Sequence, residues 1–404
     1  MDFTPTPEQA AARELAAQIF GDLSTPERLA AAGGGTDAEL WKAVCAAGLP
    51  GAVEETGLLG LVLMLEEQGR TTAQVPFAAS CVYGVLAVAA YGTEEQRERL
   101  LPGLRDGTEV ATGALGPRGA IRAAGEAPGR GAAEGARGTL SGTVPWVPWL
   151  RDATHVLVVD ADDVLWLVRA ADALTEPVEL TAPWSAGRLT LDGTPAERLG
   201  AGRPAAGRLG AGGTQDPTPG AASASGAASA SGAASASDPA SVSAYASASV
   251  SASAYADVLA TARTAFAGLQ AGVCAGSLAR AVAHTNAREQ FGRPLAAKQG
   301  VQLRAADAYM DTEAIRVTAY EAAWRRDEGL EYATHALTAA WWASEAGKRV
   351  VHAGQHLHGG AGADLDHPVH RHFLWGRQLD AYLGPGSQVL EELGDVIAKG
   401  GDRT

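Results

Sequence analysis

The pattern of hydrophobic and polar positions is helical over the first hundred residues. Apolar residues recur at helical spacing over 7–23 and again over 37–47. Thr93 followed by Gln96 has the sequence of a helix capping box, in which each side chain bonds the backbone of the other residue. We therefore predict an N-terminal helical domain over residues 1–108.

From about Glu109 the period changes from that of a helix to that of strands. Short runs rich in β-branched and aromatic residues are separated by Gly, Pro and Asp; they cover 138–144, 154–160, 164–169 and 188–193. We expect these runs to form a small β-barrel or sandwich over residues 109–202.

The last part of the chain, 254–404, is helical again. Four helical patterns run from Asp257 to Asn286, from Ala297 to about Glu328, from Tyr332 to His356 and from Ser387 to Ile397, with 359–366 as the main break. Four helices of this length predict a C-terminal four-helix bundle. The expected fold class is mainly α with a middle β module.

An Ala/Ser/Gly-rich stretch separates the β module from this bundle. Gly-Ala-Ala-Ser-Ala-Ser is repeated three times between Gly220 and Ser237, and a Ser/Ala tract follows. Such a composition cannot bury enough apolar surface to offset the entropy of ordering. We expect residues 203–253 to be a disordered linker, with a silk-like strand as the alternative.

Composition and charge narrow the range of partners. The chain of 404 residues has 46 acidic and 32 Lys or Arg residues, a formal charge of -14, which argues against binding nucleic acid or anionic membranes. Cys45, Cys81 and Cys274 are too scattered for a disulfide framework. With no signal peptide pattern and no apolar run of about 20 residues, we expect a cytoplasmic protein that binds small molecules or proteins.

Two ordered motifs point to a family. The stretch Arg288-Glu-Gln-Phe-Gly-Arg-Pro-Leu295 is followed at Gln299 by a long helical pattern, and His356-Leu-His-Gly-Gly-Ala-Gly362 comes later. Together they resemble the flavin-binding signature of the acyl-CoA dehydrogenase family. Segments similar to that family's N-terminal domain occur in the same order at 51–57, 67–70, 75–77 and 91–102. The resemblance implies FAD as cofactor and an acyl thioester as substrate.

The chemistry of FAD fits the residue types in these motifs. Arg288 can supply a cation for the pyrophosphate, Phe291 a flat ring contact and Gln299 a hydrogen bond to the adenosine end. The resemblance assigns cofactor binding to Arg288, Gln290, Phe291 and Gln299, and to His356, Gly359 and Gly360 from a neighbouring subunit. The alternative is a helix-loop-helix corner that only places Arg288 on the surface.

The β module departs from the family's pattern at its two flavin-contacting hydroxyls. Leu115 stands in the segment where the family has a hydroxyl before its Glu-Pro pair, and only Pro117 is kept. In Trp146-Val147-Pro148 the family's aromatic residue is kept, but proline replaces the second hydroxyl. Trp146 can still cover a flavin ring, or can be a core residue of the β module.

The family's catalytic glutamate is missing. Oxidation of a thioester across its α and β carbons needs a carboxylate to take the α proton. Leu383 stands at the family's usual position for that base, and Ala262 at its alternative position on an earlier helix. Asp380 or Glu391 could serve instead. His352 and His356 have the spacing of a zinc pair, but no third ligand follows at a familiar spacing, so we expect no metal site.

Three functions remain open at this point. The chain is an acyl-thioester dehydrogenase or oxidase with an unconventional base, a base-less partner subunit that completes the flavin site of a glutamate-bearing paralogue, or a non-redox enzyme such as a cyclase or dehydratase that reuses the cleft. The substrate would be an acyl-CoA or an acyl-carrier-protein thioester. The assembly would be a homodimer, a homotetramer or a heteromer.

Overall fold

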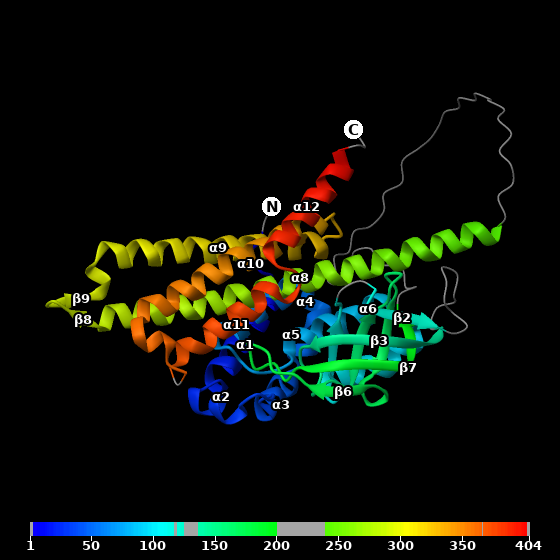
Figure 1. The fold of residues 1–404 in the computed structure, drawn as a ribbon, viewed down its shortest axis with the longest axis horizontal. Helices are drawn as coiled ribbons and strands as arrows, with labels where there is room; N and C mark the ends of the chain where they lie inside the picture. The colour runs from blue at the N-terminus through cyan, green and yellow to red at the C-terminus, as the bar shows by residue number, and fades with distance from the viewer. Residues whose placement is uncertain (1–2, 117–118, 125–135, 200–238, 366, 402–404) are drawn as a thin grey trace, which may run out of the picture.

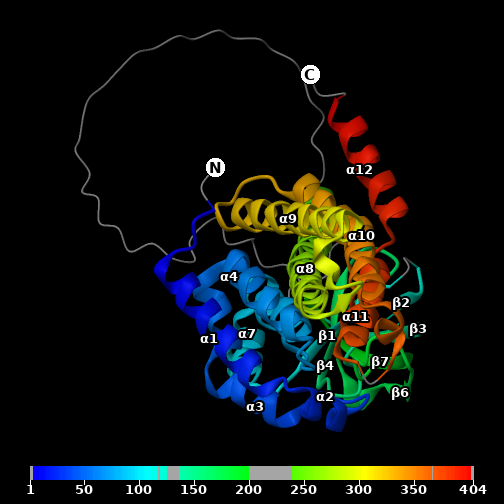
Figure 2. The ribbon, with the colours of Figure 1, turned by 90° about the vertical axis from the view of Figure 1, so that its left-hand side faces the viewer.

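The computed structural model describes residues 3–116, 119–124, 136–199, 239–365 and 367–401. Helices from both ends of the chain lie side by side, and the β module packs against one end of them (Figures 1 and 2). The three expected domains are present in the expected order. Most of the linker expected at 203–253 lies outside the described residues.

The N-terminal domain is helical, as predicted. Its elements are α1 (Pro7–Leu23), α2 (Pro26–Ala32), α3 (Ala38–Ala46), α4 (Leu49–Thr71), α5 (Phe77–Ala79), the π-helical turn η1 (Ser80–Leu86), α6 (Ala87–Tyr91) and α7 (Glu94–Asp106). The side chain of Asp37 caps α3, and the capping box of Thr93 and Gln96 begins α7. These caps satisfy amides that a helix leaves without partners in its first turn, which fixes where both helices start.

Helix α4 is interrupted at Gly57, whose φ of 70° and ψ of -167° are not helical. The half-buried Asp327 side chain at the end of α9 accepts hydrogen bonds from the amides of Leu58 (2.8 Å) and Leu59 (2.9 Å). Any side chain at Gly57 would overlap the Asp327 carboxylate. Asp327 therefore acts as an N-cap, supplied from a distant helix, for the second half of α4.

The middle domain is a seven-stranded sheet in the order β1-β4-β5-β7-β3-β2, with β6 paired to β7. The strands are β1 (Ala111–Ala114), β2 (Ile121–Ala124), β3 (Arg137–Val147), β4 (His155–Val159), β5 (Leu165–Arg169), β6 (Leu174–Pro177) and β7 (Gly187–Leu199). β1 runs parallel to β4, and the other pairs are antiparallel. The four runs predicted from sequence coincide with β3, β4, β5 and β7.

The C-terminal domain differs from its prediction in two respects. It comprises α8 (Pro239–Ala287), the hairpin β8 (Glu289–Gln290) and β9 (Arg293–Pro294), the turn η3 (Leu295–Ala297), α9 (Gln299–Asp327), α10 (Ala333–His358), η4 (Gly359–Ala363), α11 (Pro368–Tyr382) and α12 (Gly386–Gly401). The unpredicted α11 is the fourth bundle helix, because it packs on α8 and α10 while α12 leaves the body of the protein.

The second difference concerns the boundary of the linker. Helix α8 begins at Pro239, so 239–253 is helical where we expected a disordered linker to continue. Alanine has the highest helix propensity, and a helix already nucleated by the buried residues after 253 extends at little cost into an Ala/Ser tract.

Glycines allow α4 and α8 to pack with their backbones in contact. Gly268, Gly272 and Gly276 are spaced by four along α8, and a methyl group at each would overlap Val62, Glu66 and Arg70 of α4, respectively. The same spacing places all three on one face of α8. The contact joins the N-terminal domain directly to the bundle.

Helix α8 is also the one described helix that is long and apolar enough to cross a membrane, over Ala254–Ala287. Its most apolar window is 72% buried inside the protein. It therefore has the character of the central helix of the bundle.

Candidate active site and cofactor-binding tip

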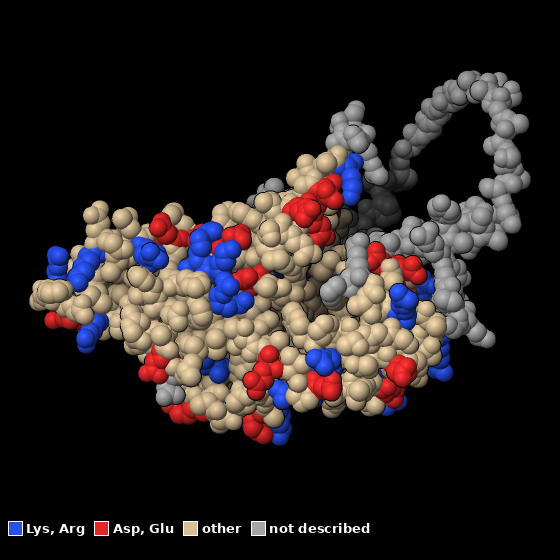
Figure 3. Space-filling model, in the orientation of Figure 1, with Lys and Arg blue, Asp and Glu red and all other residues tan. Residues whose placement is uncertain are grey.

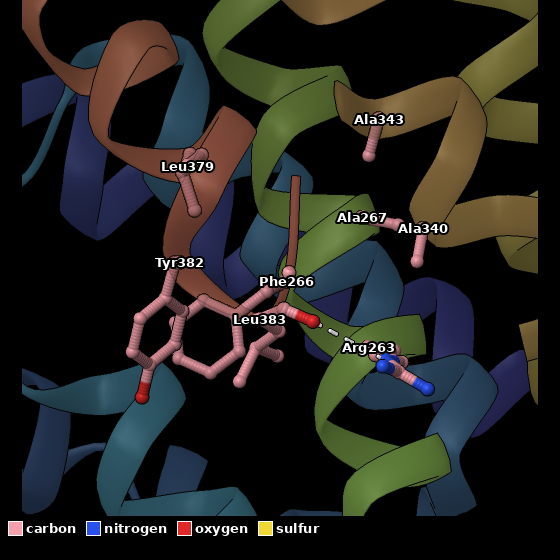
Figure 4. Close-up of a pocket in the computed structure, with 9 residues that line it drawn as sticks. Arg263, Phe266, Ala267, Ala340, Ala343, Leu379, Tyr382 and Leu383 are labelled. Atoms are coloured by element: carbon pink, nitrogen blue, oxygen red, sulfur yellow. Dashed lines mark hydrogen bonds between the residues drawn. The ribbon is translucent and has the colours of Figure 1, made fainter. Parts of the chain in front are cut away.

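The turn at Leu383 joins α11 to α12 and lines a small pocket (Figure 4). Other lining residues come from the middle of α8, from α10 and from the end of α11; they include Arg263, Phe266, Ala340, Leu379 and Tyr382. The Leu383 side chain cannot accept a proton, and no other lining residue in the described part of the chain carries a carboxylate.

Arg263 is the charged residue of the pocket, and it is fully paired. Its guanidinium forms a bidentate salt bridge with Glu392 of α12, at 3.1 and 2.7 Å, and Nε donates to the Leu383 carbonyl at 3.4 Å. The Arg263 side chain is only 7% exposed. Both oxygens of Glu392 are taken by this pair, so Glu392 is held as a structural anion and is not free to act as a base.

The other sequence candidates for a base also lie elsewhere. Asp380 is buried and pairs with Arg377 at 2.5 Å. Burial raises the pKa of Asp380. Glu391 is exposed on α12, and Ala262 is buried in α8. None of the three lines the pocket.

Aromatic side chains from all three domains meet beside this pocket; we call Tyr83, Trp146, Trp184, Phe266 and Tyr382 the aromatic cluster. The Tyr382 ring contacts Phe266, Trp184 and Trp146, with centroids 4.7, 5.8 and 5.9 Å away. The hydroxyls of Tyr83 and Tyr382 are 3.0 Å apart. Trp146 is half-buried in this cluster, so it both contacts Tyr382, which precedes the turn at Leu383, and takes part in the packing.

The motif beginning at Arg288 forms an exposed tip at the far end of the bundle, where the β8-β9 hairpin joins α8 to α9 (Figure 1). Arg288, Gln290 and Gln299 are exposed. Phe291 is 92% exposed and has a φ of 59°, a conformation rare for a bulky residue. The Lys298 ammonium lies 5.0 Å from the centre of the Phe291 ring. The tip thus presents cations and one flat apolar ring to solvent.

The second motif lies at the same end of the same chain. The His358 ring contacts that of His284, one turn before Arg288, with ring centroids 4.6 Å apart, and meets the His367 ring edge-on at 4.9 Å. His356, Gly359 and Gly360 are exposed beside them. Burial and the neighbouring His284 and His367 lower the pKa of His358, which favours a neutral ring. The two motif segments are therefore neighbours within one subunit.

Trp146 is far from this tip. It contacts Tyr382, which contacts Phe266, and 21 residues of α8 separate Phe266 from Ala287; at 1.5 Å per residue this is about 32 Å. That distance is several times the length of the ribityl chain that joins the flavin ring to the pyrophosphate. Trp146 and Arg288 of one chain therefore cannot contact the same FAD molecule.

Sequence reasoning singled out the segments that form the turn at Leu383 and the exposed tip, but it missed most of the aromatic cluster. Tyr83, Trp184 and Phe266 are separated by many residues and belong to no motif. The tertiary fold alone brings them together.

Helical N-terminal and C-terminal domains on either side of a middle β domain are the architecture of the acyl-CoA dehydrogenases. The model "Acyl-CoA dehydrogenase, N-terminal domain" matches residues 6–108, and "Acyl-CoA dehydrogenase, C-terminal domain" matches residues 253–396. The chain belongs to the acyl-CoA dehydrogenase family.

Relatives resemble the chain over nearly its full length. Acyl-CoA dehydrogenase FadE27 of Mycobacterium tuberculosis is 30% identical, with 99% of each chain covered. A variant of the Tcur3481–Tcur3483 steroid ACAD is 35% identical, with a TM-score of 0.79 and coverage of 98% of this chain and 99% of that one. The ChsE4–ChsE5 complex from Mycobacterium tuberculosis is 27% identical, with a TM-score of 0.77 and the same coverage.

Proteins of this family are FAD flavoproteins, which makes FAD the cofactor against which the residues can be tested. The tip fits: Arg288 and the neighbouring Arg293 and Lys298 match a pyrophosphate, and the exposed Phe291 offers a face for a ring. Bound FAD would supply the two-electron acceptor for oxidation of an acyl thioester. Neither Leu115 nor Pro148 has a side-chain hydroxyl that could bond to a flavin ring.

Proposed function

We propose that this chain is a base-less subunit of a heteromeric acyl-CoA dehydrogenase. Its tip completes the FAD site of a glutamate-bearing paralogue, and its own cleft does not turn over acyl thioesters. The observation that carries this proposal is the turn at Leu383, where leucine stands in place of a base and Tyr382 is packed against three other aromatic rings.

The aromatic rings around Tyr382 limit the space that is available to a substrate. A thioester undergoing α,β-oxidation must place its α and β carbons between a base and a flat electron acceptor. Here Phe266 lies in contact with Tyr382 at 4.7 Å, and Tyr83 hydrogen-bonds Tyr382 from the opposite domain. Opening a path between these rings would cost their mutual contacts and leave the buried Tyr83 hydroxyl without a partner.

The exposed tip supports the proposal that this chain completes the FAD site of a paralogue. Its residues are exposed and about 32 Å of helix away from Trp146, so they can meet only a cofactor held by another chain. The strained φ of Phe291 and its exposure are features of a binding surface that a partner or ligand covers. Two of the similar solved structures, Tcur3481–Tcur3483 and ChsE4–ChsE5, are assemblies of two different chains by their names.

The test compares the chain alone with the chain co-expressed with a paralogue that has glutamate at the position of Leu383. Flavin absorbance is measured for both preparations, followed by anaerobic bleaching on mixing with a panel of acyl-CoA thioesters. We expect bleaching of the complex and none of the chain alone. Rapid bleaching of the isolated wild-type chain would overturn the proposal and direct attention to a base supplied by the substrate or by a moving side chain.

A further inference from the structure

Three histidine rings from three helices meet where α10 turns into α11; we call His284, His358 and His367 the imidazole cluster. His358 ends α10 and contacts both of the others, with ring centroids 4.6 Å from His284 of α8 and 4.9 Å from His367. His358 is buried, and the other two side chains are half-buried. Figure 1 shows this turn near the tip end of the bundle. The cluster therefore joins the second motif to α8 and to α11.

His367 is the N-cap residue of α11. Its Nδ1 atom accepts a hydrogen bond from the Val369 amide at 3.2 Å, one of the amides that a helix leaves without partners in its first turn. A ring nitrogen can accept a hydrogen bond only while it carries no hydrogen itself. The protonated imidazole carries a hydrogen on both nitrogens, so protonation of His367 removes the cap of α11.

His358 is held as a neutral ring by its position. Its Nδ1 atom lies 2.7 Å from the Gly354 carbonyl, which can only accept, so Nδ1 carries the hydrogen and Nε2 is the atom that can gain a proton. Burial lowers the pKa of His358, and the charges of its neighbours lower it further. The unfolded chain therefore binds this proton more readily than the folded chain, so the folded arrangement loses stability as the pH falls below 6.5.

The charges around the cluster are mostly positive. The charged or titratable neighbours on the packed elements are Arg280 on α8, His356 on α10, Asp364 at the end of η4, and His370, Arg371 and His372 on α11. Asp364 is the one acid in this described set, and it is exposed. Lys and Arg gather at this end of the protein in Figure 3. A proton on His367 would also lie at the positive end of the α11 dipole. Protonation therefore adds positive charge where the surroundings already disfavour it.

We propose that the imidazole cluster is a pH-sensitive switch that releases η4 and the first turn of α11 when it is protonated. At neutral pH the His367 cap and the neutral rings hold this turn together; in acid the cap is lost and like charges separate the rings. η4 packs between α10 and α11 and carries Gly359 and Gly360, so its release would loosen the second motif. An effect on FAD rests on the proposed function, whereas the release itself needs neither FAD nor a partner.

The first experiment measures hydrogen exchange of the purified full chain by mass spectrometry at about pH 5.5 and about pH 7.5, on either side of the usual histidine pKa. After correction for the intrinsic exchange rate, the amides of 359–363 and 367–372 should lose protection roughly tenfold in acid, the effect expected from a lost helix cap. Helix α7 should keep its protection. A wild type that exchanges equally at both pH values, or that loses no more protection here than in α7, overturns the proposal.

His367→Asp separates the cap from a general effect of acid. Aspartate is a good N-cap residue and stays ionised at both pH values, so this variant should keep its protection in acid. His367→Asn, a neutral cap, should behave in the same way, and circular dichroism establishes that the variants are folded. His370→Gln is the matched control, since it removes an imidazole from the same helix but leaves the cap, and it should exchange like the wild type. Loss of protection in acid by both cap variants, as large as in the wild type, overturns the proposal.

The switch and the proposed function can fail separately. Bleaching of the complex with the paralogue at neutral pH, where the switch is closed, tests the proposed function alone. At about pH 5.5 the wild-type complex should bind FAD roughly tenfold more weakly than the His367→Asp complex, because only the wild type loses its cap. Equal affinities would overturn the control of the FAD site by this cluster and leave the proposed function standing.

Discussion

Leu383 follows Tyr382 in the turn between α11 and α12, and its carbonyl accepts a hydrogen bond from Arg263. The Arg263 guanidinium is also paired with Glu392 on the following helix. Glu392 therefore already neutralises the positive charge of Arg263, which could otherwise pair with a carboxylate in the pocket. The pocket therefore has a stable electrostatic arrangement without a base.

Restoring the acid alone should not restore the reaction. General-base catalysis typically contributes roughly 10² to 10⁴ in rate, and Leu383→Glu in the isolated chain should give far less, because the aromatic cluster and Pro148 remain. The measurement is anaerobic flavin bleaching with acyl-CoA thioesters, with Leu390→Glu as a control for the added charge. A rise into the range of full base catalysis would show that the cleft admits an acyl chain after all.

Asp327 is a second residue whose effect extends beyond its own helix. Asp327→Ala would leave the buried amides of Leu58 and Leu59 without acceptors, so we expect the free energy of unfolding to fall by about 1–3 kcal/mol. Asp307→Ala, at an exposed aspartate of the same helix, should be nearly neutral. Urea titrations of both variants check this expectation, and equal midpoints would contradict it.

The raised pKa of Asp327 also affects how the free energy of unfolding depends on pH. Burial raises the pKa of Asp327 above its usual 3.8, so the folded state holds this proton more tightly than the unfolded state. The cost of ionising Asp327 appears as the pH rises through its folded pKa and is fully present at neutral pH. The two amide hydrogen bonds offset part of that cost.

His372 should make the protein sensitive to acid. Its two ring nitrogens lie 3.3 Å from the Pro368 carbonyl and 3.0 Å from the Arg70 carbonyl, and burial lowers its pKa from 6.5 to about 4. The unfolded chain therefore binds a proton between these values before the folded chain does. The free energy of unfolding should fall as the pH drops from 6.5 toward 4, by about 3 kcal/mol in all, since one pKa unit corresponds to about 1.4 kcal/mol.

The check is urea unfolding at several pH values with His372→Asn. This variant should show a shallower loss of stability in acid than the wild type. His352→Asn, at an exposed histidine, should keep the wild-type slope. Part of the slope will remain, because burial also lowers the pKa of His155 to about 4.

At the scale of elements, the contact between α4 and α8 depends on the absence of side chains. Gly272→Ala would place a methyl group against the backbone of Glu66, so we expect a loss of about 1–3 kcal/mol or more as the helices move apart. Gly394→Ala in α12 has open space around it and should instead stabilise by up to about 1 kcal/mol through helix propensity. Thermal melts of the two variants give the comparison, and the idea fails if Gly272→Ala melts like the wild type.

The elements differ in how well the sequence predicts them. α1, α3 and α7 were predictable because each begins at a polar cap followed by a helical stripe, and β4 and β5 because their residues are strongly apolar and bounded by turns. α11 was missed because its His- and aromatic-rich sequence contains Gly376 and is buried on more than one side, so no single apolar stripe stands out. β1, Ala-Thr-Gly-Ala, has low strand propensity at every position except Thr112 and is held by its parallel pairing with β4.

The residues of the candidate site also differ in how well the sequence predicts them. The motif residues at the tip and Leu383 could be located because they occupy fixed spacings within short segments. The aromatic cluster could not, because Tyr83, Trp184 and Phe266 come from a π-helical turn, a loop and a helix whose proximity is set by long-range packing. Nor does spacing alone reveal that the two motifs lie at one end of one subunit.

At the scale of the whole molecule, the cofactor prediction concerns a contact between chains. Arg288→Ala removes a charge-assisted contact to a pyrophosphate, worth on the order of 1.5–3 kcal/mol, so the complex with the paralogue should bind FAD roughly ten- to hundredfold more weakly. Arg188→Ala, at another exposed arginine on the β module, should leave the affinity unchanged. Fluorescence titration with FAD measures both, and tight binding by Arg288→Ala would mean that the tip is only a helix corner.

The glycine contact between α4 and α8 also limits which domains of this protein can be exchanged during evolution. The chain has three domains in sequence. Gly69 of the first domain and Gly272 of the last are in backbone contact, so no side chain fits between their helices. Neither domain can be exchanged for that of a distant relative unless its counterpart is exchanged as well. The two helical domains are therefore expected to be inherited as a pair.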